Sequence, residues 1–272
     1  MSAVCHRVGI PRQNYYARRR RRERRRVNGG LVAELVLKER RIQPRIGTRK
    51  LQVILREDFK RAGVKIGRDR LFEELRQRDL LVKRQRSEYP RTTNSAHSLP
   101  IFRNLIKERT VTKANEVWVS DITYLRSDEG FLYLALLTDS HSRKIVGYHC
   151  ADTLEAVGCV KALQMALSSL PKGAKPIHHS DRGCQYCCHD YVKQLNENGL
   201  PISMTETNHS AENAQAERVN GILKGEYALG LPFQTKEQAR RAVDQAVLIY
   251  NTRRPHSSLG LQIPEAVHSL SA

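Results

Sequence analysis

Residues 117–138 read VWVSDITYLRSDEGFLYLALLT, two apolar segments joined by Asp128-Glu129-Gly130. Apolar and aromatic residues recur on both sides of this turn-forming tripeptide, so the stretch predicts two strands connected by a tight turn. A further apolar run, Lys144 to Cys150, predicts a third strand. Three strands in succession indicate that a β-sheet begins near residue 117.

Helices and short strands are expected to alternate after the third strand. The elements are a helix over 153–170, a strand over 177–180, a helix over 186–198, a strand over 202–205, a helix over 213–229 and a helix over 236–251. Three strands followed by alternating helices and strands predict the fold class, a mixed five-stranded α/β sheet with helices on both faces.

The first hundred residues hold most of the positive charge. The chain has a net charge of +19, and residues 1–100 carry 28 Lys and Arg against 10 Asp and Glu, a net of +18. Arg18 to Arg26 alone contains eight arginines. A basic region of this density attracts a polyanion by releasing counterions, so we expect nucleic acid as the partner. The second half is nearly neutral and large enough for an enzyme, which argues against a merely basic soluble protein.

The basic part of the chain is expected to be helical. Residues 1–16 read as the later part of a helix-turn-helix, which suggests a fragment or an upstream part encoded in another reading frame. Residues 30–86 read as three short helices, with Arg68 and Arg70 at outward positions, and suit a helix-turn-helix or winged variant. Residues 87–113 contain Ser, Thr, Asn and Pro and read as a linker.

Three carboxylates stand where an α/β protein places its site. Asp121 lies inside the first apolar strand, where an uncompensated carboxylate is costly. Asp181 follows the fourth strand directly and Glu217 lies on the next helix but one, so the three can converge at one edge of the sheet. Three hard oxygen donors suit two Mg²⁺ or Mn²⁺ ions that break or make phosphodiesters. Lys224, two helical turns after Glu217, would contact DNA phosphate.

Other side chains leave competing interpretations open. Cys184-x-x-Cys187 has a spacing that zinc sites use, but no second distant pair accompanies it, so buried thiols are favoured over a zinc site. Asp139 and Asp152 near strand ends are alternate candidate ligands. For His256, a structural role and a DNA contact are equally open.

Several motifs together resemble one known family. Trp118-Val-Ser-Asp121-Ile-Thr-Tyr124, His179-Ser-Asp181-Arg-Gly183 and Glu212-Asn213-Ala-Gln-Ala-Glu217-Arg resemble the DDE core of insertion-sequence transposases. Tyr250-Asn-Thr-Arg-Arg254-Pro-His256-Ser-Ser-Leu-Gly260, with Pro264-Glu265, resembles the C-terminal signature of the same family. The likeness is to second-frame (OrfB) products of the large two-frame bacterial family, and it covers nearly the whole chain. Glu212 is a departure, because many relatives carry Asp there.

The resemblance implies an RNase H-like fold similar to that of retroviral integrases. It implies that Asp121, Asp181 and Glu217 are the catalytic residues and hold two Mg²⁺ or Mn²⁺ ions. Such transposases recognise the terminal inverted repeats of their element in double-stranded DNA, cleave one strand and use the freed 3′-hydroxyl to attack target DNA. A homo-oligomer on DNA, a frameshifted fusion with the upstream-frame product and a nucleoid-associated location in bacteria are further expectations.

The domain organisation expected from these patterns has five parts. They are a basic arm with a partial helix-turn-helix over 1–29, a helix-turn-helix-like DNA-binding domain over 30–86, a linker over 87–113, an RNase H-like catalytic core over 114–230 and a C-terminal helix and tail over 231–272. The expected DNA contacts besides Lys224 are Arg18, Arg19, Arg20, Arg21, Arg22, Arg24, Arg25, Arg26, Arg68 and Arg70.

Localisation and two alternative functions complete the sequence-based expectations. No run of 18 apolar residues and no secretory signal occur, so we expect no membrane contact and a cytoplasmic protein with reduced thiols. One alternative function is a non-catalytic DNA-binding regulator whose α/β half serves only for assembly. The other is a nuclease acting on RNA–DNA hybrids, which would share the fold and the metal ions.

Overall fold

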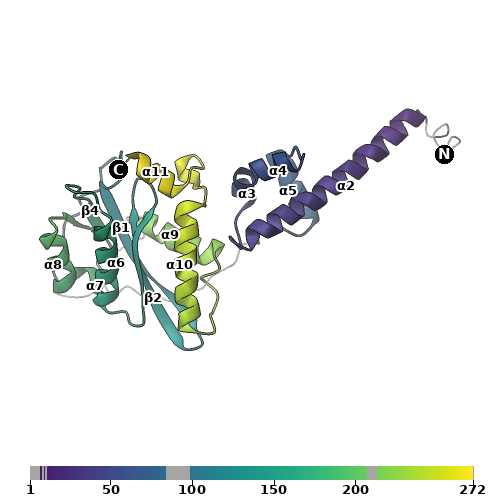
Figure 1. Ribbon diagram of the computed structural model, residues 1–272. Helices are drawn as coiled ribbons and strands as arrows, with labels where there is room; N and C mark the ends of the chain where they lie inside the picture. Colours follow the sequence, from purple (N-terminus) through teal and green to yellow (C-terminus); the bar gives the residue numbers. More distant parts are fainter. Residues whose placement is uncertain (1–6, 8, 10, 84–98, 207–212, 272) are drawn as a thin grey trace. The chain divides into compact units, whose positions relative to one another are not determined.

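The chain folds into two compact units, Met1–Lys83 and Arg84–Ala272. The structure, a computed structural model, describes residues 7, 9, 11–83, 99–206 and 213–271, and Figure 1 shows how its elements are arranged within each unit. No helix within these ranges is long and apolar enough to cross a membrane.

Helices make up the first unit. Its described helices are α2 (Arg12–Arg40), α3 (Thr48–Ile54), α4 (Arg56–Arg61) and α5 (Arg68–Gln77). The C-terminal half of α2 packs on the others, with Val36 joining Leu51 of α3 and Leu71 of α5 in a fully buried apolar cluster. The second helix expected from the sequence is divided into α3 and α4, because Leu55 leaves helical geometry at φ −90° and ψ 8°.

The long helix α2 corrects the predicted boundary between the basic arm and the helical domain. The boundary at residues 29 and 30 falls inside one continuous helix of 29 residues. A Cβ on Gly29 would lie 2.5 Å from Oε2 of Glu74 and 3.0 Å from Nη2 of Arg78, so this glycine leaves room for these two side chains of the α5 region beside α2. The arginine run is helical in backbone, and Arg18, Arg19 and Arg20 are exposed. The side chains of the other run arginines, Glu212 and most of residues 1–10 lie outside the described part.

The second unit is built on the mixed sheet that the sequence predicts. Its strands are β1 (Val117–Ser127), β2 (Gly130–Asp139), β3 (Ile145–Ala151), β4 (Ile177–Ser180) and β5 (Ile202–Met204), in the order β3-β2-β1-β4-β5. The first three strands pair antiparallel, and β1 with β4 and β4 with β5 pair parallel. The turn before Gly130 closes the hairpin at the predicted place.

Helices cover both faces of this sheet, as Figure 1 shows. On one face lie α6 (Ala156–Ser168), α7 (Cys184–Cys187) and α8 (His189–Glu197), and on the other lie α9 (Ala214–Glu226) and α10 (Lys236–Thr252). The chain then continues into α11 (Pro264–Ser271). The single helix expected over 186–198 is two helices, because Cys188 has an extended backbone with φ −68° and ψ 153°.

The segment read as a linker is shorter than predicted. Residues 99–113 pack against the second unit, where Ile106 and Val111 join the apolar cluster around Val117. The backbone N–H of Leu105 donates a hydrogen bond of 2.9 Å to Ser203 Oγ on β5. Residues 87–98 of the predicted linker lie outside the described residues.

Candidate active site

The parallel pairing of β1 with β4 brings Asp121, inside β1, beside Asp181, which directly follows β4. The paired residues are Val117 with Ile177, Trp118 with His178 and Val119 with His179. Asp121 and Asp181 each lie two residues beyond the last pair, so the same register places them beside each other. Because side chains alternate along a strand and paired residues point to the same face, both carboxylates belong on the face of Val119.

Helix α9 packs on that face and contributes Glu217. Its Ala216 lies in the small apolar cluster with Val117 and Val119. One turn later, Asn220 Nδ2 donates a hydrogen bond of 2.7 Å to Asp121 Oδ2. Glu217 lies between these two contacts along the helix, and α9 therefore brings the third acid towards the carboxylates of Asp121 and Asp181.

The three acids act on one another electrostatically. The pKa of Asp121 is raised to about 7 by burial and then by the negative charge of Asp181, with a smaller contribution from Glu217, and the hydrogen bonds from Asn220 and the backbone of Ile122 oppose this shift. Burial, followed by the charge of Asp181, also raises the pKa of Glu217. Carboxylates that shift one another in this way concentrate negative charge at one place, which favours a bound cation.

The three carboxylates belong to one site, but they are not close enough to one another to bind a metal ion together. In the part of the chain that the structure describes, no three His, Cys, Asp or Glu side chains are arranged closely enough to hold a metal ion. The donor set itself consists of carboxylate oxygens, the ligands that Mg²⁺ and Mn²⁺ prefer.

The loop after β4 fixes Asp181 through a glycine. The backbone N–H of Gly183 donates a hydrogen bond of 2.9 Å to Asp181 Oδ1. A Cβ at this position would lie 3.0 Å from the same oxygen, which is tighter than ordinary van der Waals contact. Gly183 therefore lets the backbone approach the carboxylate closely.

Lys224 lies next to the acids rather than on a solvated helix face. Its residue is 8% exposed, and Nζ stands 4.3 Å from the centroid of the Tyr124 ring. Burial lowers the pKa of Lys224 to about 8, and the negative charge of Asp121 opposes the shift. The positively charged side chain of Lys224 therefore lies beside the acidic site, further along α9 than Glu217.

Two side chains that sequence reasoning missed attach the first turn of α9 to the sheet. Asn213 Nδ2 donates to the carbonyl of Ser120 at 3.1 Å. Gln215 Nε2 donates to the carbonyl of Ser140 at 2.7 Å, and its Oε1 accepts from the Ser140 hydroxyl at 2.8 Å. Asn213 and Gln215 belong to the same sequence motif as Glu217. Their closeness to Glu217 in the sequence was the only signal that could have indicated their role.

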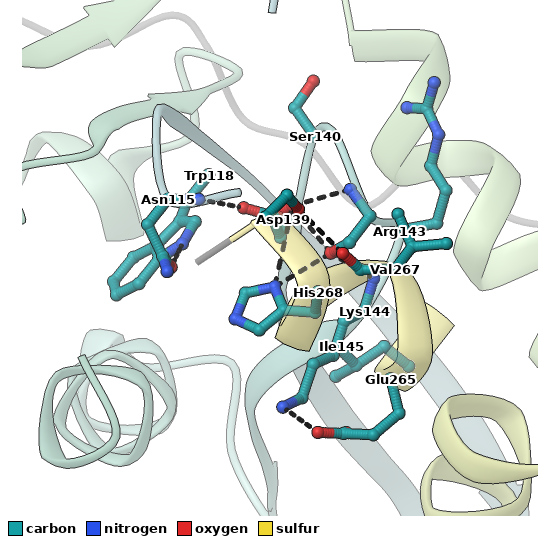
Figure 2. A network of polar contacts seen from close by, with 12 residues as sticks. Asn115, Trp118, Asp139, Ser140, Arg143, Lys144, Ile145, Glu265, Val267 and His268 are labelled. Carbon is teal, nitrogen blue, oxygen red and sulfur yellow. Dashed lines mark hydrogen bonds and ion pairs between the residues drawn. The ribbon is translucent and has the colours of Figure 1, made fainter. Parts of the chain in front are cut away.

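Asp139, one alternate ligand considered from the sequence, is enclosed in a hydrogen-bond network (Figure 2). It accepts 2.7 Å hydrogen bonds from the backbone of Asn115 and from the backbone and hydroxyl of Ser142. Burial alone would raise its pKa, but the hydrogen bonds from His268, Ser142 and Asn115 outweigh burial and lower the pKa. These contacts connect β2 to α11 and give Asp139 a structural role. Asp152, the other candidate, pairs with Lys236 and Arg240.

The cysteines near Asp181 and the histidine of the C-terminal signature are packing residues. Cys187 is buried with Sγ 3.7 Å from Met204 Sδ, and Cys188 Sγ lies 3.2 Å from the carbonyl of Gln185. His256 is buried, with Nδ1 2.9 Å from Ser258 Oγ and its ring edge-on to Tyr250. The structural alternative is therefore favoured for His256.

The arginines predicted to contact DNA belong to the other unit. Arg68 and Arg70 begin α5, where they form exposed ion pairs with Asp69 at 2.8 Å and Glu74 at 3.8 Å.

Comparisons with known proteins agree with this geometry. Two models described as "Integrase core domain" match residues 111–210 and 198–264. The 31 kDa protein of insertion element IS600 from Shigella sonnei is 36% identical over 97% of this chain and 96% of its own length. The transposase InsF of insertion sequence IS3A from Escherichia coli (strain K12) is 37% identical over 70% of this chain and 67% of its own.

The fold comparison points to integrases as well. The simian T-cell lymphotropic virus intasome, solved in complex with a PP2A regulatory subunit, contains a chain that matches with a TM-score of 0.51 and 16% identity. The match covers 82% of this chain and 70% of that one.

An integrase-core sheet with acids inside β1, directly after β4 and on α9 defines the class, the RNase H-like polynucleotidyl transferases of the DDE type. Within that class, the chain belongs to the insertion-sequence transposases that include InsF of IS3, and it acts in DNA transposition and integration.

Proposed function

We propose that Asp121, Asp181 and Glu217 are the catalytic residues and together hold two Mg²⁺ or Mn²⁺ ions. The observation that supports this proposal is that the charge of Asp181 contributes to the raised pKa of both Asp121 and Glu217, three acids that come from two adjacent strands and one helix. A bound divalent pair supplies charge stabilisation for the attacking and leaving oxygens of an in-line phosphoryl transfer. The acids would have to draw together by a small movement, which the neutralising charge of the ions favours.

The side chains around the acids have distinct tasks in this proposal. Asn220 and Gly183 hold the carboxylates of Asp121 and Asp181 in fixed orientations through their hydrogen bonds. Lys224 neutralises charge beside Asp121 and faces the scissile phosphate. Water attacks a phosphodiester at the end of the element, and the bond from phosphorus to the leaving 3′-oxygen breaks. The freed 3′-hydroxyl then attacks a phosphodiester of the target, and the bond from that phosphorus to the target's own 3′-oxygen breaks, so that the target strand leaves with a 3′-hydroxyl. Neither step needs a covalent bond to the protein.

The proposed DNA substrate is double-stranded and contains the terminal inverted repeats of the element. The exposed Arg18, Arg19 and Arg20 on α2 and Arg68 and Arg70 of α5 would contact phosphates, with the helices of the first unit acting as a helix-turn-helix-like domain. We expect the protein to act as a homo-oligomer, because two element ends must be joined. The fused or separate upstream-frame product is a further proposed partner.

The decisive test replaces one acid conservatively. Asp181→Asn should lower single-turnover cleavage of an end-containing duplex in Mg²⁺ by more than about 100-fold, because losing even a residue that only orients a metal ligand costs 10–100-fold. Asp190→Asn is the matched control, since this acid on α8 is 87% exposed and should leave the rate unchanged. An Asp181→Asn protein that cleaves and joins as fast as the wild type would overturn the assignment.

The regulator alternative makes the opposite prediction for the same proteins. A DNA-binding regulator would bind end DNA in EDTA and show no cleavage with any of the variants. Ca²⁺ should support DNA binding without turnover, because its looser coordination orients the phosphate poorly.

A further inference from the structure

The C-terminal signature begins with two side chains that dock α10 on the sheet. Tyr250 donates its hydroxyl to the carbonyl of Arg143 at 3.0 Å, in the turn between β2 and β3. Asn251 Oδ1 accepts from the N–H of Ile145 and its Nδ2 donates to the carbonyl of the same residue, both at 2.9 Å. The end of α10 is therefore tied to the first residue of β3 through both the backbone N–H and the carbonyl of that residue.

The signature then reaches α9 through a buried ion pair. Arg254 donates from Nε to Glu226 Oε2 at 2.7 Å and from Nη2 to Oε1 at 3.0 Å. The side chains of Arg254 and Glu226 are 3% and 20% exposed. The Arg254 guanidinium also stands 5.5 Å from the centroid of the Tyr250 ring. Because Arg254 is almost fully buried, a direct contact with DNA is excluded.

Glu226 is the last residue of α9, the helix that carries Glu217 and Lys224. Gln215 holds the first turn of this helix against Ser140, and Arg254 holds its last turn. A helix of 13 residues moves as a rigid element, so a tilt at its last turn changes the positions of side chains along it. A misplacement of about 1 Å can cost 100-fold in rate when reacting groups must be aligned.

We propose that Arg254 is a positioning residue for the transposition reaction, which sets the position of α9 through Glu226 and thereby aligns Glu217 and Lys224. This inference rests on the proposed roles of those two residues. It gives the C-terminal signature a task in catalysis at a distance from the DNA.

The two parallel hydrogen bonds are the feature that determines position. An arginine fork fixes both the distance and the angle of a carboxylate, whereas the lysine ammonium is a point charge on a flexible stem. Arg254→Lys therefore keeps the charge and most of the volume but loses the defined angle. Its expected effect is on alignment more than on folding.

The experiment compares Arg254→Lys with Arg240→Lys in the full chain. Arg240 lies on α10 and likewise pairs with a carboxylate, that of Asp152 at 2.5 Å, but among the described residues no hydrogen bond or ion pair joins it to α9. Three quantities are measured for each protein: the dissociation constant for an end-containing duplex, the single-turnover cleavage rate at saturating DNA and Mg²⁺, and hydrogen–deuterium exchange of peptides from α9 and α6. All are recorded well below the melting temperature of each variant.

We expect Arg254→Lys to lower the cleavage rate at least tenfold, to change DNA affinity by less than twofold and to speed exchange in α9 while α6 is unchanged. Arg240→Lys should match the wild type in all three. A wild-type rate with Arg254→Lys overturns the inference, and so does faster exchange throughout the unit, which would mean general destabilisation. Glu226→Gln, which keeps the shape of the side chain, serves as the second variant if Arg254→Lys fails to fold.

Glu217→Gln, assayed in parallel, separates this inference from the proposed function. If Glu217→Gln is inactive and Arg254→Lys is fully active, only the positioning role fails. If Glu217→Gln cleaves at the wild-type rate, the proposed catalytic assignment fails.

Discussion

At the scale of single residues, Asp121 has a proposed catalytic role, and its ionisation lowers the stability of the folded protein. Burial and two neighbouring negative charges raise its pKa to about 7, whereas the unfolded chain has a carboxyl pKa near 3.8. The unfolded state therefore ionises first as the pH rises. Stability that is fully present below the lower value is lost progressively as the pH rises to about 7, and then stays lower.

The substitution Asp121→Asn removes this titration. We expect the metal-free variant to be more stable than the wild type at pH 8 by about 2 kcal/mol, since one unit of pKa shift corresponds to about 1.4 kcal/mol and Asp121 is partly solvated. The difference should shrink towards zero between pH 7 and pH 4. Urea unfolding at several pH values measures it, and a difference that does not vary with pH would contradict the assigned pKa.

At the scale of elements, the site depends on how closely helices approach the sheet. Gly147 of β3 packs under α6, where a Cβ would collide with the carbonyl oxygen of Ala162 and lie 2.9 Å from Ala166 Cβ. The backbone of α6 occupies that space, so the neighbours cannot yield cheaply. This contact secures the helix layer that covers one face of the catalytic sheet.

Gly147→Ala should therefore destabilise the protein by about 1–3 kcal/mol through overpacking. Gly225→Ala on α9 is the matched control, because nothing lies within 4 Å of its Cβ and alanine favours a helix interior. Denaturant midpoints of the two variants should move in opposite directions. Equal stability of Gly147→Ala and the wild type would contradict the described packing of α6 on β3.

The sequence predicted strands and turns well where the pattern of neighbouring residues determines them. Apolar runs and the Asp-Glu-Gly turn placed all five strands, and the two strand aspartates with the helix glutamate were expected at one sheet edge. It did not predict that α2 runs through Gly29, since the reason is a tertiary approach to α5. Nor did it predict the Arg254–Glu226 pair, because its partners lie 28 residues apart on different elements.

At the scale of the whole molecule, the arginine run and the three candidate catalytic acids lie in different units. The first unit carries the arginine run and the second carries the acids, and the two units divide between Lys83 and Arg84. Phosphate contacts position a protein on DNA without specifying sequence, so the first unit is suited to hold the duplex while the second reacts with it.

Replacement of Arg18, Arg19 and Arg20 by Gln should weaken DNA binding and its dependence on salt. Each lost phosphate contact reduces the slope of log K against log[salt] by about 0.9, so the triple variant should flatten it by up to about 2.7. Replacing Lys172, Lys193 and Arg241 of the second unit by Gln, which removes the same charge, is the control. Identical slopes for the two triple variants would contradict a role of the α2 arginines in phosphate contact.

The proposal that Asp121, Asp181 and Glu217 hold two metal ions is tested most directly by anomalous diffraction from crystals of the protein bound to end-containing DNA and Mn²⁺. We expect two manganese peaks roughly 3.5–4 Å apart among these three carboxylates. Manganese bound elsewhere, with these carboxylates still apart at saturating Mn²⁺, would contradict it.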